Sequence, residues 1–388
     1  MNQHVLGNLT VERFLAEYWQ KKPLLIRQAI PDFESPLTPD ELAGLSCEED
    51  VESRLIESVG QNGKPWQVGH GPFDEETFAR LPEKDWTLLV QAVDHYVPEV
   101  AELLEQFSFI PRWRLDDIMI SYAPVGGNVG PHVDNYDVFL LQGSGKRHWQ
   151  LGGFKGEKAA IVEGIGLRIL KEFDIVEGED WILEPGDMLY LPPRYAHHGV
   201  SVSNDCLTYS IGFRAPSADE AVTSWADYRG EQLTASDRYA DPELTEQDPA
   251  LLDDAAIERM RQLILDRLDD KAQLTQWFGR YMTQTKYPDQ LVASEEPIRL
   301  DDVISQLNEG AFLERSLGSR FAYAPKEDGR ATLFVDGDGL DTPLEVAKSL
   351  ADPASHIESD ILDSPDVAEI IVGLLQRGSL TLIGESDH

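Results

Sequence analysis

The chain has 388 residues, enough for two or three domains, and its 41% hydrophobic and 9% aromatic residues argue against a largely disordered protein. Its 33 basic and 70 acidic residues give a net charge of −37, which disfavours direct nucleic acid binding and favours basic partners, although the acids could simply solvate the surface. No apolar run approaches the roughly 20 residues of a membrane span and no signal peptide is evident, so we expect no membrane association and a cytoplasmic protein.

Only two cysteines occur, Cys47 and Cys206, and they lie far apart outside any Cys/His cluster. This spacing predicts neither a disulfide framework nor a structural zinc site. Two reduced thiols in packed positions are the simplest interpretation.

Helical patterns alternate with loops in the first third of the chain. Thr10 is a candidate N-cap for a helix whose apolar residues recur at helical spacing over residues 11–19. Thr38 lies three residues before Glu41, which predicts a capping box. Residues 86–107 have the apolar spacing of a long amphipathic helix. We expect these helices to support the domain that follows them.

Between residues 117 and 213 the pattern changes to short β-prone runs separated by Gly and Pro. The predicted strands are 117–123, 136–142, 146–151, 180–183, 187–191, 198–202 and 207–213. Many short strands at close spacing are typical of a sandwich or barrel of the jelly-roll kind. We expect this block to be the catalytic core.

The pattern becomes helical again after Pro216. Ser217 is a candidate N-cap with Glu220 three residues later, and two further helices are predicted at 248–269 and 272–285. The segment is short for an independent domain, so its apolar side chains need a cover. We expect it to pack on the core or on a second subunit.

A mixture of helices and strands fills the C-terminal part. The predicted helices are 300–307, 343–350 and 365–377, and the predicted strands are 320–324, 331–335 and 380–383, with a turn at Asp336-Gly337-Asp338-Gly339. Helix, hairpin and helix in so few residues indicate a winged-helix module. Because acids outnumber bases here, we expect a structural or protein-contact role rather than DNA binding.

A candidate metal site begins with Gly130-Pro131-His132-Val133-Asp134. Residues i and i+2 of a strand point to the same face, so the imidazole of His132 and the carboxylate of Asp134 converge. This pair alone is weak evidence for a site. It gains weight from a turn at 184–187, a strand, and two prolines that precede His197. Two histidines and one carboxylate form the facial triad that leaves iron positions open.

A second histidine, His198, is adjacent to His197. If both lie on a strand they face opposite sides, so only one can be a ligand. We prefer His197 because of its position after the two prolines, with His198 as the alternative. For the other histidines, including His70, His95 and His148, surface or core packing is the expected role.

A 2-oxo acid that chelates iron still presents a distal carboxylate, and burying that anion requires a basic partner. The strand after Gly145 offers Arg147, which alternates with Lys146 and His148 and shares a face with Trp149. We expect Arg147 to form a bidentate pair with the carboxylate. Without the triad, a single arginine on a strand would be interpreted as a surface charge.

Four runs of sequence resemble one known family, the bacterial ribosomal oxygenases. The runs are Arg114–Ser121, Pro131–Phe139, Gly186–Pro193 and Tyr209–Arg214. The resemblance implies an α+β chain whose core is a double-stranded β-helix of the cupin, Jumonji-C (JmjC) type. It implies an oxygenase that uses iron(II), 2-oxoglutarate and dioxygen to hydroxylate an arginine side chain of a large-subunit ribosomal protein.

The resemblance also implies the domain order and the subunit count. The expected domains are a catalytic domain at 1–215, a helical dimerisation domain at 216–295 and a winged-helix-like domain at 296–388. The protein is therefore expected to be a homodimer, and its expected binding partner is a basic ribosomal protein, the substrate.

Carried over by position, the resemblance assigns three sets of site residues. The implied iron ligands are His132, Asp134 and His197. The residues implied to line the 2-oxoglutarate pocket are Arg147, Met119 and Ser121. Three acids nearby in sequence are candidates to bind a basic substrate, with surface or capping roles as the alternative: Asp116, Asp117 and Asp137.

One loop departs from the family pattern, because Arg194-Tyr195-Ala196 stands where relatives often have Gly-Phe-Pro. The departure leaves the following histidine in place. Two other functions remain open: a 2-oxoglutarate oxygenase acting on another protein residue or a small molecule, and a non-catalytic cupin-like metal-binding regulator. The acidic C-terminal segment argues against the regulator.

Overall fold

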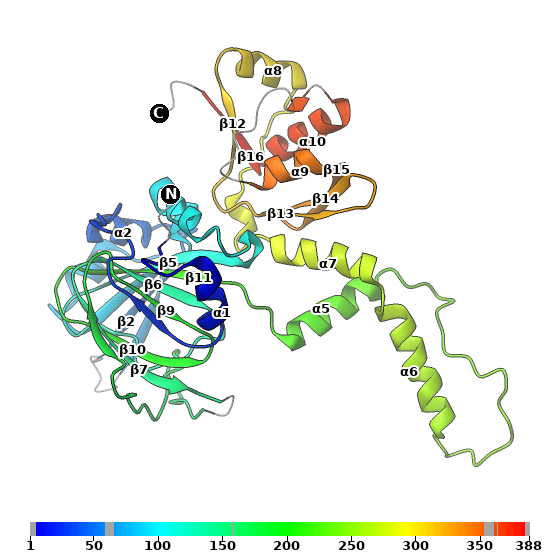
Figure 1. Ribbon diagram of the computed structural model, residues 1–388, viewed down its shortest axis with the longest axis horizontal. Coiled ribbons are helices and arrows are strands. Elements are labelled where there is room, and N and C mark those ends of the chain that lie inside the picture. The colour runs from blue at the N-terminus through cyan, green and yellow to red at the C-terminus, as the bar shows by residue number, and fades with distance from the viewer. Residues whose placement is uncertain (1–4, 59–65, 157–158, 353–360, 363, 385–388) are drawn as a thin grey trace. The chain divides into compact units, whose positions relative to one another are not determined.

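The computed structural model describes residues 5–58, 66–156, 159–352, 361–362 and 364–384 (Figure 1). The chain divides into two compact units, Met1–Ala215 and Pro216–His388. Each unit has its own hydrophobic core. The finer division into three domains stays a prediction.

The N-terminal unit combines short helices with two antiparallel sheets. Its α-helices are α1 (Val11–Glu17), α2 (Pro39–Leu45), α3 (Glu75–Ala79) and α4 (Pro98–Ala101), and its 3₁₀ turns are Val93–His95, Glu102–Phe107 and Arg112–Arg114. Its strands are β1 (Leu24–Ile26), β2 (Ser53–Glu57), β3 (Gln67–His70), β4 (Trp86–Val90), β5 (Leu115–Ala123), β6 (Val138–Ser144), β7 (Arg147–Phe154), β8 (Asp180–Leu183), β9 (Met188–Leu191), β10 (Tyr195–Ser201) and β11 (Cys206–Phe213).

The predicted helix starts of this unit are confirmed. The side chain of Thr10 accepts a hydrogen bond from the N–H of Arg13 and caps α1. Thr38 and Glu41 form a reciprocal capping box at the start of α2. Local sequence was sufficient here because both partners of each cap lie within one helical turn.

The larger sheet has eight strands in the order β1-β9-β6-β11-β5-β4-β2-β3, and the smaller sheet has the order β10-β7-β8. Side chains from both sheets meet in one apolar cluster between them: Val138, Leu140, Trp149, Leu151, Leu183, Leu189 and Leu191. The other face of the large sheet joins the main core, which includes Phe14 of α1 and Leu42 of α2. This is the double-sheet arrangement that the strand pattern predicts.

Strand β5 lies in the large sheet between β11 and β4 and contributes to both faces. Ile118 and Ile120 belong to the main core. Because side chains alternate along a strand, Asp117, Met119 and Ser121 point to the opposite face, toward the space between the sheets. The interior of the double sheet is therefore lined partly by polar groups.

The predicted helix at residues 86–107 is wrong. The first residues form β4, which pairs with β2 and β5, and the rest forms 3₁₀ turns and the four-residue helix α4. Pro98 interrupts the helical pattern, while the run from Trp86 to Val90 is rich in aromatic and β-branched residues that favour a strand. Tertiary pairing therefore prevailed over helical spacing.

The C-terminal unit contains six α-helices and five strands among its described residues. The helices are α5 (Ala218–Gly230), α6 (Asp254–Leu268), α7 (Lys271–Thr283), α8 (Leu300–Asn308), α9 (Leu344–Ala351) and α10 (Pro365–Gln376), with a 3₁₀ turn at Pro288–Gln290. The strands are β12 (Phe312–Arg315), β13 (Phe321–Pro325), β14 (Arg330–Val335), β15 (Asp338–Pro343) and β16 (Leu380–Ile383). β12 pairs with β16, and β13, β14 and β15 form a meander.

Two sequence features shape this unit. Asp336 and Gly337 both have positive φ, 51° and 90°, and join β14 to β15 through a two-residue turn, as the Asp-Gly pair predicts. Ser217 and Glu220 form a capping box at the start of α5. Helix α7 packs on the meander: Gly279 lies against the ring of Phe334, where a Cβ atom would be only 2.3 Å away.

Helix α6 contains no buried residue, a property that it shares with α5. Ile257, Met260, Ile264 and Leu265 are exposed, and their spacing of three, four and one residues places them on one side of the helix.

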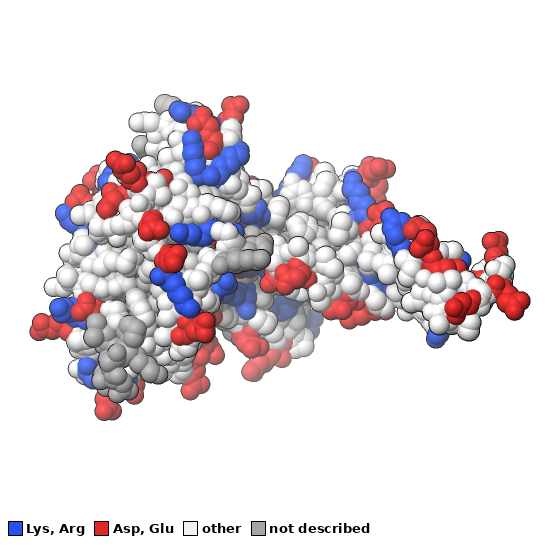
Figure 2. All heavy atoms as spheres, turned by 90° about the horizontal axis from the view of Figure 1, so that it is seen from below, with Lys and Arg blue, Asp and Glu red and all other residues white. Residues whose placement is uncertain are grey.

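No described helix combines the length and the apolar character needed to cross a membrane. In Figure 2, the basic side chains lie scattered among acidic ones.

Candidate metal centre

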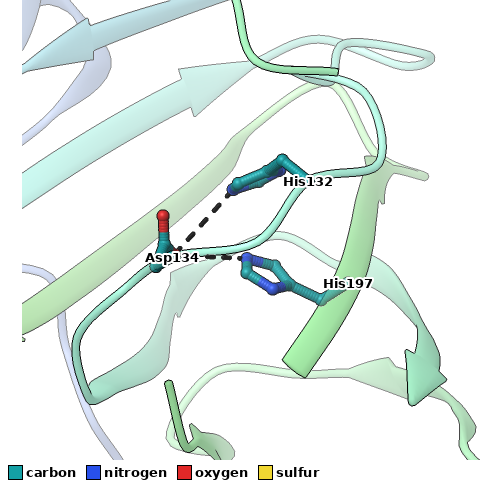
Figure 3. A group of neighbouring side chains, drawn as sticks. All are labelled: His132, Asp134 and His197. Atoms are coloured by element: carbon teal, nitrogen blue, oxygen red, sulfur yellow. Dashed lines mark ion pairs between the residues drawn. The ribbon is translucent and has the colours of Figure 1, made fainter. Parts of the chain in front are cut away.

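The structure brings His132, Asp134 and His197 together (Figure 3). One potential ligand atom from each lies within 4.8 Å of the other two. The Oδ2 atom of Asp134 is 4.0 Å from Nε2 of His132 and 3.6 Å from Nε2 of His197. Two segments more than 60 residues apart in the sequence thus supply one group of three donors.

The extended residues 130–134, here called the metal strip, are held beside β10 by backbone hydrogen bonds. The N–H of His132 donates to the carbonyl of His197 at 3.0 Å, and the N–H of His197 donates to the carbonyl of His132 at 3.0 Å. This reciprocal pair is an isolated β-bridge between the two histidines. It explains why their rings lie only 4.2 Å apart between centroids.

Both imidazole rings are oriented by backbone carbonyls. Nδ1 of His132 lies 2.9 Å from the carbonyl oxygen of Gly130, and Nδ1 of His197 lies 2.9 Å from that of Tyr195. Because a carbonyl only accepts, each Nδ1 carries the proton, and the lone pair of each Nε2 is free. Burial, followed by the neighbouring His132, lowers the pKa of His197 to about 4, so its ring is neutral at pH 7.

His198 faces away from this group. Its Nε2 lies 3.3 Å from Oδ1 of Asn128, and its ring makes an edge contact with Phe173. Asn128 in turn accepts the N–H of Gly130 at 2.9 Å and so supports the metal strip. Of the two adjacent histidines, it is His197 whose ring joins Asp134.

The three donors suit a divalent transition metal. Neutral imidazoles with a carboxylate match iron(II), whereas a structural zinc site would use four ligands and more sulfur. Both histidines carry the second hydrogen bond that commonly fixes a ligand's tautomer and orientation. On the chemistry of the donor set, the residues fit an iron(II) centre with open positions.

Arg147 is buried inside the double sheet, with 3% of its surface exposed. Its guanidinium makes two long contacts of 3.5 Å, to Oγ of Ser121 and to the carbonyl of Gly199. Among the described residues its Nε has no hydrogen-bond partner, and the same holds for the buried Nε1 of Trp149. Met119 shares the face of Ser121 on β5 and is half-buried. A buried cation with unused donors indicates a site for an anion.

The acidic candidates on β5 lie near the metal strip. The carboxylate of Asp134 raises the pKa of Tyr136, and partial burial, Asp117 and Asp116 add to the rise, while 43% of the residue is still exposed. The three carboxylates are therefore close enough to act on one phenol. Tyr136 was not predicted as a residue near the site; its only signal in the sequence was its position two residues after Asp134.

Asp137 occupies a different environment. Its carboxylate is fully buried and accepts hydrogen bonds from Tyr190 Oη at 2.6 Å, Gln20 Nε2 at 3.0 Å and Arg114 Nη2 at 3.4 Å. Burial raises its pKa, and these donors oppose that rise. The carboxylate oxygens of Asp137 are thus engaged within the core.

A further buried carboxylate supports β5 just beyond the point where the pairing of β5 with β4 ends. Oδ1 of Asp94 accepts the N–H of Ile118 at 2.7 Å, next to Asp117. Burial raises the pKa of Asp94 to about 6, with His95 opposing the rise and Asp117 adding to it. Asp94 therefore takes the place of a strand partner at this point of the sheet.

The connection between β7 and β8 runs along the metal strip. The N–H of Leu170 donates to the carbonyl of Pro131 at 2.7 Å, and Ile169 packs so closely on Gly130 that a Cβ there would lie 2.8 Å from its side chain. Gly130 has a φ of 78°, which glycine adopts without steric cost, and its lack of a Cβ atom leaves room for Ile169. This connection covers one side of the strip.

Comparison with known proteins gives full-length matches. The JmjC domain family model matches residues 102–221, the ROXA-like winged helix matches residues 266–381, and the AraC-like ligand binding domain matches residues 176–300. The ribosomal protein uL16 3-hydroxylase of Escherichia coli is 35% identical over 94% of this chain and 95% of its own length. A probable ribosomal oxygenase of Haemophilus influenzae is 36% identical over 95% of this chain and 93% of its own length.

Solved structures agree with these matches. An X-ray structure of E. coli YcfD has a TM-score of 0.87 and 33% identity, and covers 97% of this chain and 99% of YcfD. A structure of YcfD in complex with cobalt and 2-oxoglutarate has a TM-score of 0.85 with the same identity and coverage.

Proposed function

The chain belongs to the ribosomal oxygenase family, and from that premise we propose that it is an iron(II)- and 2-oxoglutarate-dependent oxygenase that hydroxylates an arginine side chain of a large-subunit ribosomal protein. The family matches confirm the predicted fold class, an α+β chain with a JmjC-type cupin core and a C-terminal winged helix. The observation that supports the activity most strongly is the group of His132, Asp134 and His197.

In this proposal His132, Asp134 and His197 hold the iron(II). When bound, the metal supplies the oxidative decarboxylation of 2-oxoglutarate by dioxygen that is coupled to hydroxylation of a C–H bond. The protein contributes two imidazoles oriented by backbone carbonyls and a carboxylate fixed by the metal strip. The apolar cluster between the sheets keeps water away from the reacting groups.

Arg147 is the proposed partner of the distal carboxylate of 2-oxoglutarate. The guanidinium is buried, its Nε has no partner in the described part of the chain, and its contact to Ser121 is long enough to be replaced by an anion. Met119 and Ser121 are proposed to line the same pocket, because they share one face of β5. A bidentate carboxylate would use the donors that now lack short hydrogen bonds.

The proposed substrate group is a cationic guanidinium. Asp116 and Asp117 lie close enough to Tyr136 to raise its pKa, and Tyr136 itself offers an exposed aromatic face. Carboxylates beside an aromatic ring suit an arginine side chain through charge and cation–π attraction. Asp137 is a weaker candidate, since binding substrate would require it to release Tyr190 or Gln20.

Mass spectrometry tests the activity. The purified chain is incubated with iron(II), ascorbate, 2-oxoglutarate and large-subunit ribosomal proteins, with the His132→Ala variant as control. We expect one ribosomal protein to gain a single oxygen on an arginine, together with succinate. An oxygen on another residue would replace the arginine assignment. No oxygen gain and no turnover of 2-oxoglutarate would overturn the oxygenase.

We also propose that the protein is a homodimer whose interface uses α6. This helix buries none of its own residues, yet Ile257, Met260, Ile264 and Leu265 form a continuous apolar side. A helix of this kind needs a cover to be stable in water, and a second copy supplies the same surface in return. The helical dimerisation domain at 216–295 and the winged-helix-like domain at 296–388 remain proposals. In this division α7, from the first domain, packs on the β13–β15 meander of the second.

The dimer is tested by the mass in solution. Light scattering after gel filtration is expected to give twice the chain mass for the wild type. The Met260→Glu/Ile264→Glu variant is expected to be a monomer, because two buried charges face each other across a two-fold interface. A monomeric wild type at micromolar concentration would contradict the proposal.

The location and partners follow from the proposed substrate. A protein that modifies ribosomal proteins is expected in the cytoplasm, where they are assembled. Its net charge of −37 favours a basic protein over direct contact with RNA. Tight binding of bulk RNA at physiological salt would contradict this assignment.

A further inference from the structure

Arg194 has a backbone conformation that residues with side chains rarely adopt. Its φ is 64°, in the left-handed region. The Cβ atom makes this conformation unfavourable, and glycine takes it at no steric cost. Arg194 lies at the turn between the two prolines and β10, directly before the strand that supplies His197. A strained residue at this place requires a compensating interaction.

Three hydrogen bonds compensate at this one residue. The N–H of Arg194 donates to the carbonyl of Asp134 at 2.6 Å. Its side-chain Nε donates to the carbonyl of Lys155 at 2.8 Å, and its own carbonyl accepts the N–H of Lys155 at 2.9 Å. Lys155 directly follows β7. Arg194 therefore joins the metal strip, the turn before β10 and the end of β7.

The bond to Asp134 complements the bridge between the two histidines. His132 and His197 exchange both of their backbone hydrogen bonds, which fixes one end of the metal strip. The Asp134 end is held by the N–H of Arg194. Because the turn is left-handed, this N–H points at Asp134 only while the turn is maintained.

We propose that Arg194 is a positioning residue for the metal centre. Its guanidinium, bonded to the Lys155 carbonyl, locks the turn whose N–H holds Asp134 in place for the metal. The inference rests on the proposed role of Asp134 as a metal ligand. A glycine at this position would allow the left-handed turn but could not supply the side-chain hydrogen bond to the Lys155 carbonyl.

Substitutions at residue 194 separate the strain from the side-chain bond. Arg194→Gly removes both, Arg194→Ala keeps the strain but loses the bond, and Arg194→Lys keeps a donor. Arg168→Ala is the matched control, because Arg168 is exposed on the β7–β8 connection that begins with Lys155. Asp134→Ala tests the metal centre itself.

The affinity of the purified full-length chain for manganese(II) is measured by titration at constant pH without cosubstrate. We expect Arg194→Ala to weaken the affinity about 10-fold or more, as lost support of a ligand commonly does, and Arg194→Gly to weaken it several-fold. Arg194→Lys is expected to recover part of the loss, and Arg168→Ala to match the wild type. Thermal melting of each variant shows whether it is folded.

Two results would overturn the inference. One is Arg194→Gly binding manganese(II) as tightly as the wild type while Asp134→Ala loses it. The other is an equal loss of manganese(II) affinity in Arg194→Lys and Arg194→Ala when thermal melting shows both to be folded. If Asp134→Ala retains full manganese(II) affinity, the proposed metal centre is wrong instead, so the two failures are distinguishable.

Discussion

Two buried charged side chains in the same unit, Asp137 and Arg147, have opposite surroundings. The carboxylate of Asp137 is surrounded by donors from Tyr190, Gln20 and Arg114. The guanidinium of Arg147 lies 5.8 Å from the centre of the Trp149 ring, makes two hydrogen bonds of 3.5 Å, and has an Nε without a hydrogen-bond partner in the described chain. A buried charge with its own partners stabilises a fold, whereas one with unused donors awaits a ligand.

The largest expected effect concerns the metal centre, which lies in the same unit as these two charges. His197→Ala should reduce metal affinity by about 100-fold or more, because a two-ligand site is weak, with little loss of stability. His198→Ala should change it by less than about 10-fold, because that ring contacts Asn128 and Phe173 instead. Manganese(II) titration of both variants provides the measurement. The reverse order would make His198 the ligand.

Asp137→Ala tests the partnered charge. It leaves Tyr190, Gln20 and Arg114 without their shared acceptor, so we expect a loss of about 3–5 kcal/mol in unfolding free energy. Asp137→Asn keeps an acceptor and should lose less. The half-saturating concentration of 2-oxoglutarate should be unchanged in whatever fraction remains folded. Denaturant unfolding and 2-oxoglutarate turnover provide the two measurements, and a cosubstrate defect at full stability would reverse the assignment.

Arg147→Ala tests the unpartnered charge. The loss of charge-assisted hydrogen bonds worth about 1.5–3 kcal/mol should raise the 2-oxoglutarate requirement roughly 10- to 100-fold. Stability should be retained or improved, since no short internal bond is lost. Lys146→Ala, a neighbour exposed on the other face and paired with Glu184, is the matched control. An unchanged cosubstrate requirement would mean that another residue holds the carboxylate.

The smallest effect concerns Asp94, which has one firm partner. Its pKa is raised to about 6 against about 4 in the unfolded chain, so its stabilising contribution is complete below pH 4 and lost as pH rises through 6. The stability difference between wild type and Asp94→Asn should therefore shift against the wild type by on the order of 2 kcal/mol between pH 4 and pH 7.5. Unfolding curves at both pH values decide it, and a pH-independent difference would contradict it.

Sequence periodicity was sufficient for the parts of the site that lie close together in the chain. Alternation along an extended segment placed His132 beside Asp134, and turn residues indicated the return of His197. The pairing register between the metal strip and β10 depends on contacts across more than 60 residues, so the sequence favoured His197 over His198 only through its position after the two prolines. The acids of β5 that raise the pKa of Tyr136 come from another strand, and no local pattern reveals their proximity.

The fold could be anticipated wherever local chemistry decided it. Caps at Thr10, Thr38 and Ser217 depend on neighbours within one turn, and the Asp336-Gly337 turn depends on two residues. The helix expected at 86–107 failed because strand pairing with β2 and β5 overrode helical spacing. The sequence also could not predict that Arg147 has unused hydrogen-bond donors, because this requires knowing its burial and all of its neighbours.

The backbone bridge between His132 and His197 bears on how the metal arrives. Since hydrogen bonds of the chain itself hold the strip beside β10, the ordering entropy of the ligands is spent during folding rather than during metal uptake. The metal should therefore exchange without refolding of the double sheet. A protein stripped by a chelator should keep slow amide exchange at His132 and His197 and recover full metal content on simple addition of the ion.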